Sequence, residues 1–240
     1  MLQLWYQKPA TYWEEALPLG NGRLGAMVWS GVDHETLSLN EDSLWSGYPK
    51  CADIPGAVEY YKQAQQLARE KKYSEAQELL EDMFLSDYTQ SYLPLADLKL
   101  ELEHPQGDVE NYRRSLSLED AISRLTYTIG GTTYTREAFV SAPDQAIVLR
   151  IQADKPGSIT LKARFDCRLR SSCTIEDGRL VLDGVAPSQV DPSYLGETPN
   201  PIVYEEDPQK KGMRFCAILE AQAQGKIRFI SITNHRLAVA

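Results

Sequence analysis

Adjacent carboxylates are the residues of this sequence best suited to acid–base chemistry. Such neighbours occur at Glu14-Glu15, Glu41-Asp42, Glu119-Asp120 and Glu205-Glu206-Asp207. Two carboxylates that cleave a bond together must stand on opposite sides of that bond, whereas neighbours in a strand point to opposite faces of a sheet. Because the chain has 34 acidic residues, adjacent pairs are also expected by chance. We therefore predict no catalytic residue in this chain.

Nucleophilic, metal-binding and cofactor-binding patterns are weak in this sequence. No Gly-x-Ser-x-Gly motif is present, and Gly20, Gly22 and Gly25 have the spacing of a dinucleotide-binding loop without a βαβ pattern around them. No C-x-x-C pair occurs, and three histidines are few ligands for a zinc site. We predict no metal and no cofactor, and we interpret the cysteines as thiols of a reducing compartment. The four cysteines are Cys51, Cys167, Cys173 and Cys216.

Composition and charge narrow the classes of partner. The 240 residues are 42% hydrophobic and 25% charged, with a formal net charge of -9 at pH 7, which is typical of a globular protein. Since phosphate binding needs clustered lysine and arginine, we expect no nucleic-acid partner. No stretch reaches the ~20 apolar residues that cross a bilayer, and the first residues lack the pattern of a signal peptide. We therefore expect no membrane partner, and a location in the cytoplasm or, after removal of a leader, outside the cell.

Most of the sequence alternates apolar and polar residues with a period of two. From Leu98 to Glu103, leucines alternate with charged residues, which is typical of a half-buried antiparallel strand. Gly130-Gly131 and Asp177-Gly178 each separate two such runs and predict tight hairpin turns. Many short strands separated by turn signals roughly every 8 to 12 residues predict a mainly β, antiparallel sandwich.

Residues 57–84 have helical rather than strand periodicity. Their apolar residues recur three or four positions apart. Ser74-Glu75-Ala76-Gln77 has the form of a capping box, which would start a second helix at Ser74. We predict a helical hairpin inserted in the β domain. Its role is either to cover an edge of a sheet or to clamp another domain.

Two segments toward the C-terminus differ from the rest. Residues 186–212 hold five prolines, which predicts a long irregular loop and a candidate lid. Residues 227–233 predict a strand, Asn234-His235 a turn, and 236–240 a returning strand. Because this return stops within an apolar alternation, we expect the sequence to be a fragment of a longer protein.

Several motifs in a fixed order carry a family resemblance. W-E-E-A-L-P-L-G-N-G-R-L-G-A-M from Trp13 and L-N-E-D-S-L-W-S-G from Leu39 resemble the N-terminal domain of glycoside hydrolase family 95, the α-L-fucosidase family. Further segments resemble that domain in the same order, so the resemblance spans about residues 5–240. These segments are 92–98, 112–118, 134–139 and 141–145.

The resemblance implies both a fold and an activity. It implies an antiparallel β super-sandwich over residues 1–240, as the N-terminal domain of a longer glycosidase whose (α/α)6 catalytic barrel is absent here. The implied reaction of the parent protein is inverting exo-hydrolysis of a terminal α-L-fucose, with the acid and the base in the barrel. The implied partners are that barrel, in the same polypeptide, and fucosylated or related glycans. We expect the fragment alone to be inactive.

The candidate site residues are Asn21, Arg23, Asn40, Glu41 and Trp45. They combine hydrogen-bonding groups with a large aromatic side chain on predicted turns. Three interpretations remain open. The polar residues could close turns while Trp45 packs in the core, the set could press against a neighbouring domain, or it could contact sugar directly.

Two functional classes follow from the sequence. The first is a noncatalytic N-terminal domain that supports a catalytic barrel and rims its sugar site. The second is a free carbohydrate-binding β module, in which Trp5, Trp13, Trp29 and Trp45 would offer stacking platforms. Of these, Trp29 is expected in the core because it lies within a predicted strand.

Overall fold

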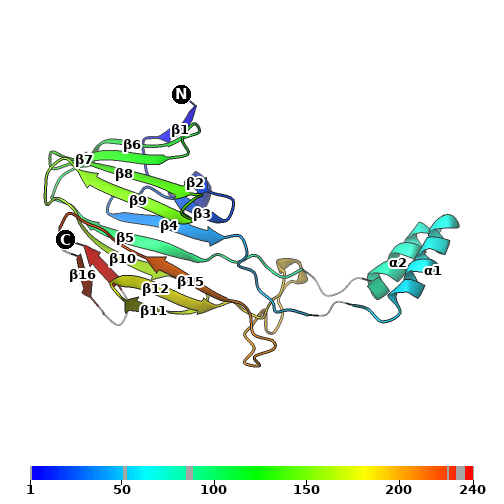
Figure 1. The fold of residues 1–240 in the computed structure, drawn as a ribbon. Helices are drawn as coiled ribbons and strands as arrows, with labels where there is room; N and C mark the ends of the chain where they lie inside the picture. The colour runs from blue at the N-terminus through cyan, green and yellow to red at the C-terminus, as the bar shows by residue number, and fades with distance from the viewer. Residues whose placement is uncertain (1, 51–52, 85–88, 226, 231–235, 240) are drawn as a thin grey trace.

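The computed structural model shows stacked antiparallel sheets and one pair of helices (Figure 1). It describes residues 2–50, 53–84, 89–225, 227–230 and 236–239. The predicted fold class, mainly β with an inserted helical hairpin, is confirmed. No helix in the described ranges has the length and apolar character needed to cross a membrane.

Two sheets contain most of the strands. The larger has seven strands in the order β16-β17-β10-β5-β4-β3-β2, and the other has five in the order β1-β6-β7-β8-β9. The bounds in the larger sheet are β2 (Leu17–Gly20), β3 (Leu24–Val28), β4 (His34–Glu41), β5 (Ala96–Glu103), β10 (Thr160–Asp166), β16 (Ile227–Ile230) and β17 (Arg236–Val239). Those in the five-stranded sheet are β1 (Gln3–Tyr6), β6 (Glu110–Ser117), β7 (Ser123–Ile129), β8 (Thr132–Ser141) and β9 (Ala146–Ala153).

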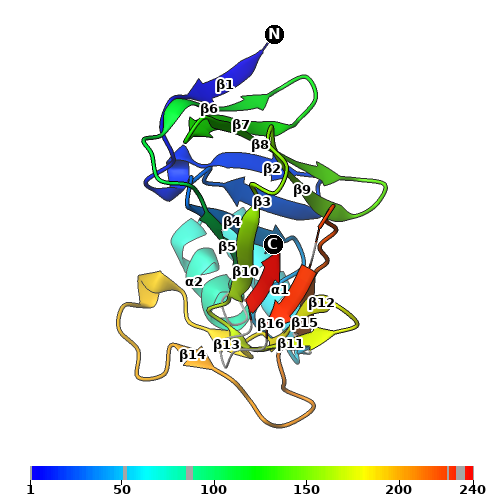
Figure 2. The same cartoon turned by 90° about the vertical axis from the view of Figure 1, so that its left-hand side faces the viewer.

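The remaining strands form a three-stranded sheet, ordered β11-β12-β15, and a two-stranded sheet of β13 and β14. The two-stranded sheet lies within the proline-rich segment, which is otherwise mostly irregular as predicted and extends away from the other sheets (Figure 2). The bounds are β11 (Arg170–Glu176), β12 (Arg179–Val185), β13 (Gln189–Val190), β14 (Ile202–Val203) and β15 (Arg214–Leu219), with short 3-10 helices at Trp13–Glu15 and Ser193–Leu195.

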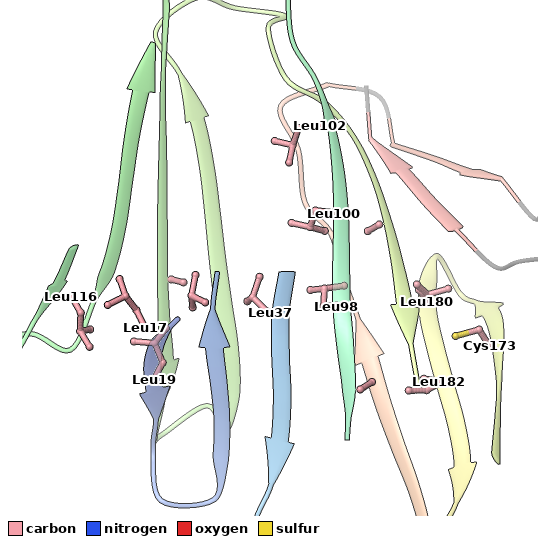
Figure 3. Packing of buried hydrophobic residues seen from close by; sticks show 14 residues of the cluster. Leu17, Leu19, Leu37, Leu98, Leu100, Leu102, Leu116, Cys173, Leu180 and Leu182 are labelled. Carbon is pink, nitrogen blue, oxygen red and sulfur yellow. The ribbon is translucent and has the colours of Figure 1, made fainter. Parts of the chain in front are cut away.

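One hydrophobic cluster joins the three larger sheets. Leu98, Leu100 and Leu102 of β5 are buried while the charged residues between them face outward, as the alternation predicts. Leu116 of the five-stranded sheet and Leu180 of the three-stranded sheet belong to the same cluster (Figure 3). The inner face of the seven-stranded sheet is therefore covered by the five-stranded and the three-stranded sheets. Each fully buried leucine contributes about 1.5 to 3 kcal/mol, so this layer holds the fold together.

Both predicted hairpin turns are present. Gly130 and Gly131, between β7 and β8, have φ angles of 56° and 69°, and Asp177 and Gly178, between β11 and β12, have 47° and 74°. Two consecutive positive φ angles match the twist of a tight hairpin. A Cβ atom on Gly130 would also lie 2.9 Å from Cγ of Pro105, so glycine is needed there for space as well.

The helical hairpin consists of α1 (Ala57–Arg69) and α2 (Tyr73–Phe84). The predicted start at Ser74 is wrong by one residue, because the Ala76 amide already donates to the Lys72 carbonyl at 3.1 Å. The prediction that the hairpin covers a sheet edge is also wrong. Figure 1 shows both helices beyond the end of the sandwich and away from the edges of the sheets, where they pack against each other.

The C-terminal strands pair as predicted, with β16 antiparallel to β17. The predicted turn at Asn234-His235 and residue Cys51 lie outside the described residues. Cys167, Cys173 and Cys216 are free thiols. Within the described part of the chain, no group of three or more His, Cys, Asp or Glu side chains is arranged to hold a metal ion.

Candidate functional site

All five candidate residues lie at the end of the sandwich from which the helices project. The turn between β2 and β3 and the end of β4 meet there, because β3 and β4 pair with Leu24 opposite Glu41. Tyr92, from the segment that returns from the helices, joins them. We call this set the loop-end cluster; its members are Asn21, Arg23, Asn40, Glu41, Trp45 and Tyr92.

Asn21 closes the turn between β2 and β3. Its side-chain oxygen accepts hydrogen bonds from the amides of Arg23 (3.0 Å) and Leu24 (2.8 Å), as in an Asx turn. Its side-chain nitrogen donates to the Ser141 carbonyl at 2.9 Å, which ties this turn to the five-stranded sheet. For Asn21, the turn-closing interpretation therefore accounts for the bonds of the side-chain oxygen, while the side-chain nitrogen joins two sheets.

Arg23 and Glu41 form an ion pair at the surface. Nε of Arg23 donates to Oε1 of Glu41 at 3.0 Å, and a second guanidinium nitrogen donates to Gln145 at 3.3 Å. Partial burial opposes ionisation of Glu41, but hydrogen bonds from the hydroxyl and amide of Ser43 and from Arg23 outweigh it and hold the pKa of Glu41 below its ordinary value. A carboxylate with a lowered pKa is a poor general acid.

Trp45 and Tyr92 form an exposed aromatic pair. Their ring centroids lie 5.2 Å apart at an interplanar angle of 52°, and the residues are 39% and 44% exposed. The indole nitrogen of Trp45 donates to the Asp42 carbonyl, and the side-chain nitrogen of Asn40 donates to the Tyr92 hydroxyl at 2.5 Å. The interpretation that Trp45 packs in the core is therefore wrong.

Two paired segments, 44–47 and 90–93, carry the chain out to the helices; we call them the paired legs. The Ser46 amide donates to the Ser91 carbonyl at 2.9 Å, and the Leu93 amide donates to the Leu44 carbonyl at 3.0 Å. Leu44 and Leu93 are buried in a second hydrophobic cluster that includes Ala186. The base of the legs is thus anchored in the sandwich.

The loop-end cluster is suited to recognition rather than bond cleavage. It offers an aromatic face, an amide and a guanidinium, which together can stack on and hydrogen-bond a polar surface or a sugar ring. Its carboxylate, from Glu41, is already paired with Arg23. No second carboxylate of the cluster stands opposite it, and hydrolysis of a glycosidic bond needs two carboxyl groups across the bond.

A buried polar cluster lies at the opposite end of the sandwich and was not predicted. Arg136 of β8 donates to Glu35 at 3.1 Å and to the Tyr127 hydroxyl at 2.7 Å. His104 lies 2.9 Å from that hydroxyl through Nε2 and 2.9 Å from the Asp33 carboxylate through Nδ1. Burial raises the pKa of Tyr127, so its phenol stays protonated as a hydrogen-bonding bridge. These residues fasten the five-stranded sheet to the seven-stranded one.

A shallow hollow of about 360 Å³ lies beside the buried polar cluster. His104 and Tyr134 line it, but the His104 side chain is 4% exposed and Tyr134 is 1% exposed. These rings therefore present little surface to a ligand. Of the two ends, the loop-end cluster is the stronger candidate for a functional surface.

Sequence comparisons identify related proteins. Residues 4–240 match the family model described as "Glycosyl hydrolase family 65, N-terminal domain". Alpha-L-fucosidase 2 of Arabidopsis thaliana is 34% identical over 245 residues, covering 99% of this chain and 28% of that protein. Probable alpha-fucosidase A of Aspergillus niger is 33% identical over 63% of this chain and 20% of that protein, and its Aspergillus oryzae counterpart is 30% identical over 62% and 21%. The chain thus spans less than a third of the length of these relatives.

Proposed function

The chain belongs to the glycosyl hydrolase family 65 N-terminal domain family and is the N-terminal domain of an α-L-fucosidase-like glycoside hydrolase, and from this premise we propose that it supports the catalytic part of that enzyme. The relatives confirm the resemblance to α-L-fucosidases that the sequence motifs predicted. We propose the role of this domain within the enzyme, the sugar that the enzyme releases and the segment that the domain contacts.

Unequal coverage is the observation that carries this proposal. The match takes in 99% of this chain but only 28% of the Arabidopsis fucosidase, so that relative contains a large segment with no counterpart here. A domain that recurs beside such a segment, and whose loop-end carboxylate, Glu41, is paired with Arg23, is best explained as support for chemistry performed elsewhere. The resemblance assigns the acid and the base to a helical barrel in that segment.

The loop-end cluster supplies the surface through which support would act. Trp45, Tyr92 and Asn40 combine aromatic area with a polar edge at the end of the sandwich, where loops commonly carry function. We infer that these residues pack against the catalytic part and rim its sugar site. Arg23, with an exposed side chain, would contribute hydrogen bonds at the border of this contact.

Removal of the domain tests the proposal. The complete polypeptide should release fucose from fucosylated oligosaccharides, and the same polypeptide without residues 1–240 should lose that activity and unfold at a lower temperature. Residues 1–240 alone should release none. Full turnover and an unchanged melting temperature in the truncated protein would contradict a supporting role, as would enzyme-like fucose release by the isolated chain.

A free carbohydrate-binding module is the second candidate, favoured by exposed tryptophans. Trp5 and Trp13 are 50% and 56% exposed, in addition to Trp45, whereas Trp29 is half-buried with its indole nitrogen bonded to Ser38. Calorimetric titration of the isolated chain with fucosylated oligosaccharides separates the candidates. Binding that Trp45→Ala abolishes and Trp5→Ala leaves intact would favour the module, and the absence of binding heat would favour the supporting domain.

A further inference from the structure

The helical hairpin buries little apolar surface of its own. Among its residues only Ala64 and Ala76 are buried, while Val58 is 64% exposed, Tyr61 51% and Phe84 37%. The helices have 13 and 12 residues. Helices shorter than about 12 to 15 residues are marginal in water unless tertiary packing supports them. A hairpin with this exposure is therefore suited to packing against a further surface.

Three exposed apolar residues form one stripe across both helices, whereas Tyr73, 66% exposed, lies at the opposite end of α2 from Phe84 and outside that stripe. Val58 and Tyr61 lie three positions apart on α1 and so share a face of that helix. The ring of Tyr61 contacts the ring of Phe84 on α2, with 6.4 Å between centroids. We call Val58, Tyr61 and Phe84 the hairpin stripe. Its continuity across both helices gives a partner one surface to cover.

The paired legs are joined to each other by side-chain as well as backbone hydrogen bonds. Besides the backbone bonds between them, the Ser46 hydroxyl donates to the Gln90 side chain at 2.8 Å and accepts from the Ser91 amide at 2.9 Å. The Gly47 amide donates to the Pro187 carbonyl, which fastens one leg to the proline-rich segment. Trp45 and Tyr92 lie on these same legs, so the hairpin continues outward from the loop-end cluster.

We propose that the hairpin stripe docks onto the segment of the complete polypeptide that the relatives have and this chain lacks. The inference rests on the proposed function and names the surface through which it acts. Three apolar side chains bury far less than the ~800 Å² per partner that stable complexes of separate chains need. A partner in the same polypeptide is present at high effective concentration, so a small contact suffices. That difference favours the covalently linked segment over a second copy of the chain.

Hydrogen exchange on the complete polypeptide and on residues 1–240 tests the docking. We expect the amides of α1 and α2 to exchange at least about tenfold more slowly in the complete polypeptide, because docking suppresses local opening. Val58→Lys should remove that protection without weakening the hairpin itself, since lysine is a better helix former than valine. Gln63→Lys is the control for the added charge, because it places a lysine on α1 roughly 200° around the helix from Tyr61.

The outcomes separate this inference from the proposed function. Protection in the complete polypeptide that Val58→Lys removes and Gln63→Lys preserves would establish the docking. Equal exchange of the helices in both proteins would overturn it, even where removal of residues 1–240 abolishes activity and the supporting role stands. Protection that grows with the concentration of residues 1–240 alone would also overturn it, because a second copy would then be the partner.

Discussion

Two glutamate–arginine pairs at opposite ends of β4 have nearly the same geometry and very different surroundings. Glu35 and Arg136 lie 3.1 Å apart with side chains 1% and 2% exposed, and Glu41 and Arg23 lie 3.0 Å apart with side chains 18% and 53% exposed. About 20 Å of strand separates the two glutamates. The two pairs are chemically alike, so the cost of removing one partner should follow mainly from how deeply the other is buried.

Burial lets the polar cluster around Arg136 hold two sheets together, whereas the exposed loop-end cluster can contact a partner. Glu35 accepts from the amides of Ser30 and Thr36 as well as from Arg136, because a buried charge must satisfy its oxygens within the protein. At the loop end, water can replace any lost partner, so side chains there are free to serve a neighbouring surface.

Removing the buried arginine should have the largest effect. Arg136→Met leaves Glu35 as an uncompensated buried charge and should lower the free energy of unfolding by about 3 to 5 kcal/mol. Arg23→Met is the matched change at the loop end and should cost at most about 1 kcal/mol. Urea unfolding of both variants measures the difference. Equal losses of unfolding free energy would contradict the distinction between the buried and the exposed ion pair.

Removing a tyrosine hydroxyl should also cost more stability at the buried Tyr127 than at the exposed Tyr92. Tyr127→Phe removes the group that bridges His104 and Arg136 and should cost about 1 to 3 kcal/mol, because both partners stay buried. Tyr92→Phe loses contacts that water can replace and should change stability by less than about 0.5 kcal/mol. Thermal unfolding distinguishes them; a larger loss for Tyr92→Phe would show that the loop end also holds the fold.

The aromatic pair should matter for activity more than for stability. In the complete polypeptide, Trp45→Ala should reduce fucose release about tenfold, corresponding to about 1.4 kcal/mol, the scale of an aromatic interface residue. Trp5→Ala is the control, since Trp5 is also exposed, at 50% against 39% for Trp45, but lies on the edge strand β1. Turnover assays on both variants would refute the functional role of the loop end if the two changes had the same effect.

The smallest expected effect is the pH dependence of the surface pair. Because the pKa of Glu41 is lowered in the folded state, the hydrogen bonds from Ser43 and the ion pair with Arg23 stabilise the fold above the unfolded value of about 4.3. This contribution is lost as pH falls through the folded value. Comparison with Glu41→Gln from pH 7 to pH 3 should show a difference of about 0.5 kcal/mol that closes at low pH. A constant difference would contradict the assigned shift.

Local sequence patterns were sufficient to predict the fold class and several of its elements. The alternation around Leu98–Leu102 and the turn at Gly130-Gly131 act within a few residues, so their outcome is visible in the sequence. The position of the helical hairpin could not be predicted in this way. The segments 44–47 and 90–93 on either side of it pair with each other, and they are more than 40 residues apart in the sequence. Helical periodicity reports that a face is apolar and carries no information about what covers it.

The site was predictable to the extent that its residues are neighbours in sequence. Asn21 with Arg23 and Asn40 with Glu41 are close along the chain, and the pairing of β3 with β4 joins the two groups. Tyr92 was missed because it is 52 residues from Asn40, and the hydroxyl contact between them exists only in the folded chain. The buried polar cluster was missed for the same reason, since Glu35 and Arg136 are 101 residues apart.

Oxidative footprinting of the aromatic residues tests whether the loop end faces the catalytic part of the enzyme. If it does, oxidation of Trp45 and Tyr92 should be suppressed in the complete polypeptide relative to residues 1–240. Trp5 and Trp13 serve as internal references and should be oxidised equally in both. Equal oxidation of Trp45 and Tyr92 in the two proteins would contradict this orientation of the loop end.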